Sequence, residues 1–143
     1  AGCEHAVRAA GTATLLTIDA AAFAAGETVA RARAAGVTAY LARDMFVMRE
    51  LLTQLRATGL QAPRDVSVLA LGGGSPSLLP GMRPSRVRIN REQVGELAVQ
   101  VLINRISGKS PERQHILVPC EFVAGETTAA PGSASPGNIE GGV

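Results

Sequence analysis

The sequence predicts an α/β fold in which a Rossmann-like parallel sheet is flanked by helices. Residues 37–74 carry this prediction, because an apolar run, a segment with apolar residues at helical spacing and a second apolar run follow one another there. The second run, residues 66–71, is too continuous for a half-exposed strand and is typical of a parallel strand covered on both faces. A strand, a helix and a parallel strand together make a β-α-β crossover.

Capping residues mark the boundaries of this unit. Asp44 stands directly before the helix, where its carboxylate can cap the first turn. Gly59 and Pro63 follow the helix, which is the usual way for a helix to end. The apolar residues at helical spacing are Met48, Leu51, Leu52 and Leu55. Ligands of open parallel sheets bind outside the carboxyl ends of the strands, so we expect a site near Arg43 and residues 72–75.

Three elements are expected before this unit. Residues 1–10 are alanine-rich and predict a helix that begins without a capping residue. Residues 12–18, TATLLTI, predict a strand, and residues 27–35 predict a helix that Gly36 ends.

The C-terminal half continues the alternation of strands and helices. Residues 87–89 predict a short extended segment, and Asn90 is a good N-cap for a helix over residues 91–107. Residues 116–123 predict a last strand. Residues 124–143 are rich in Gly, Ser, Pro and Thr and predict a flexible tail.

Composition limits the classes of function. The chain has 143 residues, of which 46% are hydrophobic and 18% charged, so it can form a globular domain. A net charge of +2 argues against a surface for polyanions. The two cysteines, Cys3 and Cys120, match no metal or redox spacing and indicate reduced thiols in a cytoplasmic protein. No secretory signal and no apolar run of the ~20 residues that a membrane span needs is found, so we expect no membrane association.

Several segments resemble one known family. PRDVSVLAL, SRVRINREQVGELAVQVLINRISGK and ILVPCEFVAGETT look like the C-terminal half of LacI/GalR-family bacterial transcription regulators. LARDMFVMRELLTQLRATGLQ occupies the place of the family's preceding helix, and AGCEHAVRAAG resembles its first helix, with Cys3 where an aromatic residue is usual. The resemblance covers residues 1–128, and it is specific because these motifs occur in the right order at the right spacings.

The resemblance implies a periplasmic-binding-protein-like effector domain of two subdomains. It divides residues 1–123 into a C-terminal subdomain, residues 1–86 and 116–123, and a returning segment of the N-terminal subdomain, residues 87–115. It implies a ligand-sensing and dimerisation domain of a repressor that controls genes for sugars or related metabolites. Operator DNA would be bound only through a helix-turn-helix headpiece, which this chain lacks. A sugar-binding protein of transport or chemotaxis, and a degenerate domain that binds no effector, are the alternatives.

The resemblance also places the effector-binding residues. Sugar-binding members usually carry Asn where Arg43 stands and Asp where Gly72 and Gly73 stand, so a neutral sugar is disfavoured here. Arg43 suits a carboxylate or phosphate on an anionic effector, or it is an ordinary exposed residue at a strand end. Phe23 suits either stacking on an effector or packing in the core.

No catalytic, cofactor or metal site is predicted. GGGSPS lacks the Lys-Ser/Thr ending of a phosphate-binding loop, and His5 and His115 complete no catalytic arrangement. A basic cluster could contact DNA, but a solvated role or a role at the crossover is the stronger interpretation; it comprises Arg83, Arg86, Arg88 and Arg91.

Two apolar surfaces predict contacts with other chains. The family places dimer contacts on the helix after Asp44 and on the loop of residues 72–84, and the corresponding apolar residues are Met48, Leu51, Leu52, Leu78 and Leu79. Packing of this helix on its own sheet is the alternative. The helix over residues 91–107 carries an apolar stripe, so we expect it to pack on a partner chain or on its own sheet. This stripe comprises Val94, Leu97, Ala98, Val101, Leu102 and Ile106.

Overall fold

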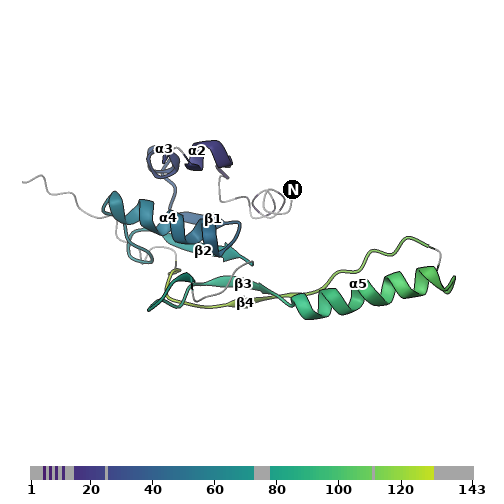
Figure 1. The fold of residues 1–143 in the computed structure, drawn as a ribbon. Coiled ribbons are helices and arrows are strands. Elements are labelled where there is room, and N and C mark those ends of the chain that lie inside the picture. Colours follow the sequence, from purple (N-terminus) through teal and green to yellow (C-terminus); the bar gives the residue numbers. More distant parts are fainter. Residues whose placement is uncertain are drawn as a thin grey trace, which may run out of the picture.

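A sheet with one long helix against it forms the centre of the structure (Figure 1). The computed structural model describes residues 5, 7, 9, 11, 15–24, 26–72, 78–110 and 112–130. In chain order the elements are α2 (Ala20–Ala24), α3 (Thr28–Ala34), β1 (Ala39–Ala42), α4 (Met45–Ala57), β2 (Ser67–Leu71), β3 (Arg86–Ile89), α5 (Arg91–Ile106) and β4 (Cys120–Val123).

The described sheet has the strand order β1-β2-β3-β4. β1 pairs in parallel with β2, with Tyr40 opposite Val68, and β2 pairs in parallel with β3, with Leu71 opposite Val87. The predicted β-α-β crossover and its parallel strands are therefore confirmed. β4 returns antiparallel to β3, with Phe122 opposite Val87, so the sheet is mixed.

α4 covers one face of this sheet. Asp44 caps the helix by accepting hydrogen bonds from the amides of Phe46 and Val47 at 3.0 and 2.9 Å. The buried side of α4 packs on alternate residues of β1 and β2. The helix contributes Met45, Met48, Leu51, Leu52 and Leu55, and the strands contribute Tyr40, Ala42, Val68 and Ala70. The prediction that β2 is covered on both faces is wrong for the described residues, because Leu71, on the face away from α4, is 37% exposed.

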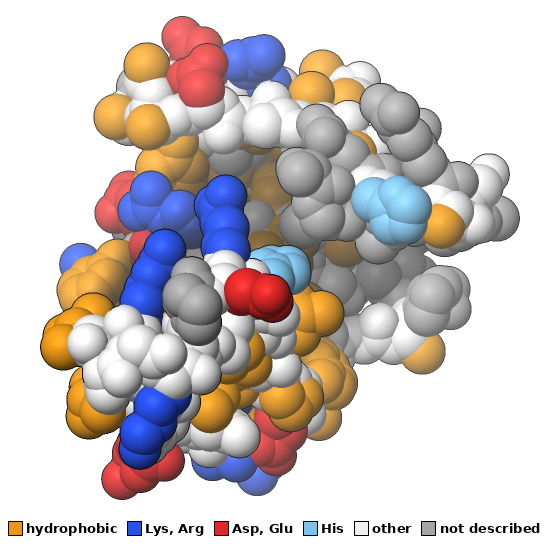
Figure 2. Space-filling model, turned by 90° about the vertical axis from the view of Figure 1, so that its right-hand side faces the viewer, with side chains coloured by type: hydrophobic (Ala, Val, Ile, Leu, Met, Phe, Trp, Pro, Cys, Tyr) orange, Lys and Arg blue, Asp and Glu red, His pale blue; other side chains and the backbone are white. Residues whose placement is uncertain are grey.

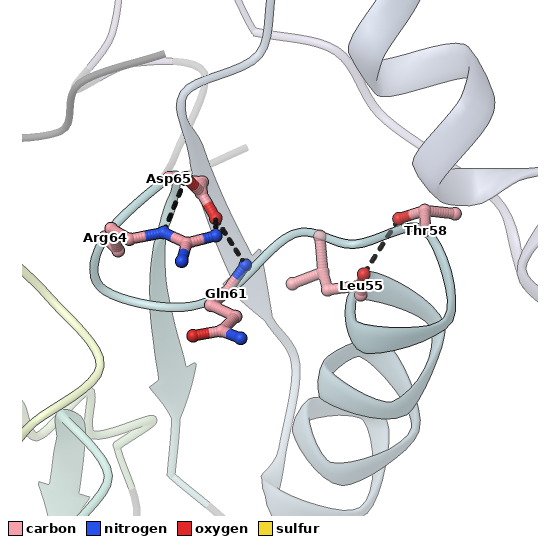
Figure 3. Close-up of polar contacts among 5 residues, drawn as sticks. All are labelled: Leu55, Thr58, Gln61, Arg64 and Asp65. Carbon is pink, nitrogen blue, oxygen red and sulfur yellow. Dashed lines mark hydrogen bonds and ion pairs between the residues drawn. The ribbon is translucent and has the colours of Figure 1, made fainter. Parts of the chain in front are cut away.

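The turn from α4 to β2 is closed by a local polar network (Figure 3). The Thr58 hydroxyl donates to the Leu55 carbonyl at 2.8 Å, at the end of the helix. The Asp65 carboxylate then accepts from the Gln61 amide at 2.8 Å and from two nitrogens of Arg64. These bonds hold the chain in the position from which β2 begins.

Residues 124–130 are hydrogen-bonded to the sheet. The prediction of a flexible tail over residues 124–143 is therefore wrong for residues 124–130. Thr127 is fully buried; its carbonyl accepts from the Val68 amide and its hydroxyl donates to the Val68 carbonyl, each at 2.7 Å. Gly125 crosses the backbone of residues 83–85 so closely that a Cβ would overlap the Arg83 carbonyl oxygen. Residues 131–143 lie outside the described residues.

α5 extends away from the sheet (Figure 1). Asn90 caps it as predicted, accepting from the Gln93 amide at 3.1 Å. No residue of α5 is buried, and Ile106 is 78% exposed. Figure 2 shows hydrophobic side chains at the surface in the lower part of the view. The expectation that α5 packs on its own sheet is therefore wrong, whereas packing on a partner chain stays a prediction.

Two predicted strands differ from what the structure shows. Residues 15–18 form no strand, and residues 12–14, like most of the predicted first helix, lie outside the described residues. Residues 116–119 run beside α5 before β4 begins at Cys120. Both departures concern segments at the borders of the described sheet, where paired strands are lacking.

Candidate functional site

The carboxyl ends of three parallel strands meet at one edge of the sheet. β1 leads into Arg43, β2 into Gly72 and β3 into Asn90. This is the edge at which open parallel sheets bind ligands. From here on, the strand-end site means Arg43, Gly72, Ile89 and Asn90.

Arg43 is the cation of the strand-end site. Its side chain is 84% exposed, and its Nε donates to the Asp44 carboxylate at 3.1 Å. Among the described residues its two terminal nitrogens have no protein partner. Asp44 thus orients the guanidinium while it caps α4, and a fork that faces solvent in this way suits a planar oxyanion.

The charge of Asp44 is stabilised by the same contacts. The hydrogen bond from the Val47 amide, together with those from Arg43 and Phe46, lowers the pKa of the Asp44 carboxyl below its usual value. Asp44 therefore stays ionised at neutral pH, as both of its roles require.

The backbone at Gly72 favours glycine, and the tip of Ile89 lies close beside it. Its φ is +64°, in the left-handed region that favours glycine, and a Cβ would lie 2.8 Å from Ile89 Cδ1. A side chain at this position is therefore disfavoured by the backbone conformation, and it would also require the tip of the Ile89 side chain to move. Gly73, the other predicted glycine of the site, lies outside the described residues.

Phe23 and Arg43 line one cavity of about 370 Å³. Most of its other walls are apolar, and they include Leu41 and Leu71. Phe23 is also half-buried against the core, and its carbonyl accepts from the Gln54 side chain at 3.3 Å. Phe23 therefore lies in the same cavity as Arg43, but its contacts with the core are those expected if Phe23 packs in the core and does not stack on an effector.

The crossover to α5 adds residues that the sequence did not indicate. Ile89, Asn90 and Cys120 line a second cavity of about 620 Å³ at the point where the chain leaves the sheet and returns to it. Arg88 also lines it and forms an ion pair with Glu121 on the neighbouring strand. The sequence signal that could have indicated Ile89 and Asn90 is their position at the end of β3, because β3 ends at the same edge of the sheet as β1 and β2.

The basic cluster is partly neutralised. Arg83 donates to Glu126 at 2.9 Å, and Arg88 pairs with Glu121. These pairings favour the structural interpretation of both arginines over a contact with DNA.

The three predicted interface residues of α4 belong to the core of the chain itself. Met48 is 0% exposed, and Leu51 and Leu52 are buried beside it. Their side chains therefore leave no surface for a second chain, and the alternative of packing on the sheet accounts for them. Leu78 and Leu79 are half-buried and also contact this core.

The described residues offer neither a metal-binding cluster nor a membrane-spanning helix. No group of three or more His, Cys, Asp or Glu side chains that could hold a metal ion occurs among them. Within that same part of the chain, no helix is long and apolar enough to cross a membrane.

Comparison with known proteins identifies the family. The model of the periplasmic binding protein-like domain matches residues 1–128. The HTH-type transcriptional repressor MelR of Bacillus subtilis (strain 168) is 26% identical over 72 residues, which are 50% of this chain and 21% of MelR.

Solved structures of transcription regulators share the fold. The transcriptional regulator CelR in complex with cellobiose superposes with a TM-score of 0.70 at 23% identity, over 88% of this chain and 40% of that chain. The transcription regulator CcpA of Lactococcus lactis gives a TM-score of 0.67 at 16% identity, over 90% of this chain and 49% of that chain. The chain thus spans less than half the length of these relatives. The chain belongs to the periplasmic binding protein-like domain family, whose model covers residues 1–128.

Proposed function

We propose that this chain is the effector-sensing part of a DNA-binding transcription regulator and is not an enzyme. The observation that carries the proposal is the strand-end site, where three parallel strands deliver Arg43, Gly72 and Asn90 to one edge. The same edge is where the chain crosses over to α5. A ligand bound there contacts both the sheet and the start of the α5 arm.

This arrangement suggests how binding is coupled to a response. β3 and β4 carry the two connections to α5, at Asn90 and at Pro119. An effector that prefers one orientation of α5 relative to the sheet shifts the population toward that orientation. In a regulator whose two orientations bind operator DNA with different affinity, such a shift changes DNA binding. The difference in effector affinity between the two orientations sets the upper limit of that change.

The chemistry of the site favours an anionic effector. Arg43 supplies a solvent-facing guanidinium, whereas Gly72 supplies no side chain and Ile89 fills the space beside it. Neutral polyols need several polar partners, because every hydroxyl that loses water must find a new hydrogen bond. A carboxylate or phosphate group on the effector instead obtains a charge-assisted fork from Arg43.

A homodimer is part of the proposal. Leu78 and Leu79 lie on the loop between β2 and β3, and Phe46 on the outer side of α4 is 56% exposed. A partly exposed apolar loop and an exposed aromatic side chain are the kinds of surface that a second chain covers. Leu79→Asp in the full-length protein should lower the dimer fraction in analytical ultracentrifugation, and Thr53→Asp, on exposed α4 surface, should not.

The function is tested by DNA binding of the full-length protein. A regulator will shift a labelled fragment of its own promoter region in a gel, and an effector will change the midpoint of that shift. A full-length protein that binds a metabolite tightly but binds no DNA would instead support the transport or chemotaxis alternative.

A further inference from the structure

Ile89 covers the end of β2. Gly72, the first residue after β2, is buried, and a Cβ there would lie 2.8 Å from Cδ1 and 3.3 Å from Cγ1 of Ile89. The Ile89 side chain itself is 41% exposed. A molecule that occupies the strand-end site at the end of β2 therefore meets the apolar side chain of Ile89, which β3 supplies, and not the backbone of Gly72.

Ile89 also stands at the base of the arm, which comprises α5 and residues 116–119 beside it (Figure 1). Ile89 is the last residue of β3 and directly precedes Asn90, whose side chain caps α5. Two adjacent residues thus connect the strand-end site with the first turn of the helix.

The base of the arm is a ribbon of two strands. β2 pairs only with the first two residues of β3, and this pairing ends at Leu71 opposite Val87. The last two residues of β3, Arg88 and Ile89, pair with β4 alone among the described strands. Two-stranded ribbons twist more strongly than larger sheets, so the arm can change its orientation relative to the sheet here.

The side chain of Ile89 can transmit a contact to this ribbon. Its Cδ1 can rotate away from a neighbouring group. Its Cγ1 cannot do so easily, because the χ1 angle of a β-branched residue is stiff. A group that presses on Cγ1 therefore acts on the backbone of β3.

One effector can reach both Arg43 and Ile89. The two residues stand at the ends of β1 and β3, with β2 between them, so their strands are two spacings, roughly 10 Å, apart. The exposed Arg43 side chain shortens this span by its own length. An anion of the size of a sugar acid can then place its charged group at Arg43 and its body against Ile89.

We infer that Ile89 is the positioning residue that couples the strand-end site to the arm: an effector anion held by Arg43 contacts the Ile89 side chain, and this contact sets the twist of the ribbon at the base of α5. The inference rests on the proposed function, because it concerns the response to the same effector. Arg43 determines the affinity for the anion, and Ile89 determines how much the arm responds.

A distance measurement tests the coupling without effector or DNA. Spin labels are attached to Thr53→Cys on α4 and Gln100→Cys on α5 of the full-length protein, both at exposed positions, after Cys3 and Cys120 are replaced by serine. The labelled protein is diluted with excess unlabelled protein, so that only distances within one chain are measured. Pulsed electron paramagnetic resonance then reports the distance between the sheet and the arm.

Gly72→Ala is the variant that disturbs the contact, because its methyl group meets Cδ1 and Cγ1 of Ile89. It should shift the distribution of distances, and adding Ile89→Ala should restore the parent distribution. An unchanged distribution in Gly72→Ala would mean that the Ile89 side chain moves aside on its own, and this result would overturn the inference. A shift that persists with Ile89→Ala would come from backbone strain at Gly72 and would overturn it as well.

DNA binding tests the response itself. The midpoint of the gel shift is measured with and without the sugar acid or sugar phosphate that binds the parent protein most tightly. Ile89→Ala should bring the ratio of the two midpoints about threefold or more closer to one, while the midpoint without the anion stays near that of the parent. Ile89→Val, which removes only Cδ1, should have a smaller effect.

A purely structural role of Ile89 would give the opposite pattern. The midpoint without the anion would then change and the ratio would stay as in the parent, which would overturn the inference. If the full-length protein binds no DNA, the proposed function fails, and the distance measurement still decides whether Ile89 couples the site to the arm.

Discussion

The hydroxyl of Thr127 donates a 2.7 Å hydrogen bond to the backbone carbonyl of Val68, although 59 positions separate the two residues in the sequence. The same oxygen accepts from the buried Ser85 amide at 2.9 Å. One side chain therefore joins β2, the start of β3 and the segment after β4.

Thr127→Val is expected to destabilise the fold by about 1–3 kcal/mol, because it leaves the Ser85 amide and the Val68 carbonyl without a side-chain partner in a buried place. Urea unfolding followed by circular dichroism measures this change. Thr53→Val, on the exposed side of α4, is the matched control and should change the free energy of unfolding much less. Equal effects of the two substitutions would contradict a special role for Thr127.

Gly72→Ala should also be destabilising, for two separable reasons. The left-handed backbone at Gly72 costs a residue with a Cβ about 1–2 kcal/mol. The new methyl group would also meet Ile89 Cδ1, at 2.8 Å in the present geometry.

A double-mutant cycle with Ile89→Ala separates the two reasons for the Gly72 effect. Removing the Ile89 side chain should relieve the contact but not the backbone strain, so Gly72→Ala should cost less in the Ile89→Ala background and still cost something. If Gly72→Ala costs the same in both backgrounds, the packing of Ile89 does not restrict this position.

Acid should weaken the fold through Asp44 and Asp65. Hydrogen bonds from Val47 and Arg64, respectively, are the largest causes that lower the pKa of these two carboxyl groups. A lowered folded-state pKa contributes stability above the unfolded value of about 3.9 and loses it as the pH falls through the folded value. Asp65→Asn should therefore reduce the difference in stability between about pH 6 and about pH 3.

The control for the acid experiment is Glu112→Gln, which removes the same charge from an exposed loop. It should leave the pH dependence of stability close to that of the parent chain. An Asp65→Asn variant whose stability falls with acid as steeply as the parent would show that the Arg64 and Gln61 contacts do not set this dependence.

Local signals in the sequence predicted much of the fold. The sequence identifies Asp44 and Asn90 as caps, because an N-cap side chain bonds to amides only two or three residues away along the chain. The periodicity of α4 likewise predicted the buried face, although Met48 was also assigned to an interface that the core excludes.

Contacts between distant segments could not be predicted in this way. Thr127 stands in a Gly, Ser and Thr-rich segment, whose composition is that of a flexible tail, and only its pairing with Val68 makes it a buried residue. The loss of side-chain space at Gly72 depends on Ile89, which belongs to another strand. The exposure of α5 reflects the absence of a covering surface in the described chain, and no pattern within α5 reports that.

Binding of small anions to the full-length protein tests the central claim most directly. Isothermal titration calorimetry with a panel of sugar phosphates, sugar acids and the corresponding neutral sugars should give binding by an anionic member. Arg43→Gln should weaken that binding about tenfold or more, because it removes a charge-assisted fork. A tenfold loss of affinity corresponds to about 1.4 kcal/mol of binding free energy. Arg31→Gln, which removes the same charge from exposed α3, should bind as the parent does. Preferred binding of a neutral sugar, or an equal affinity of the Arg43→Gln variant, would contradict the account.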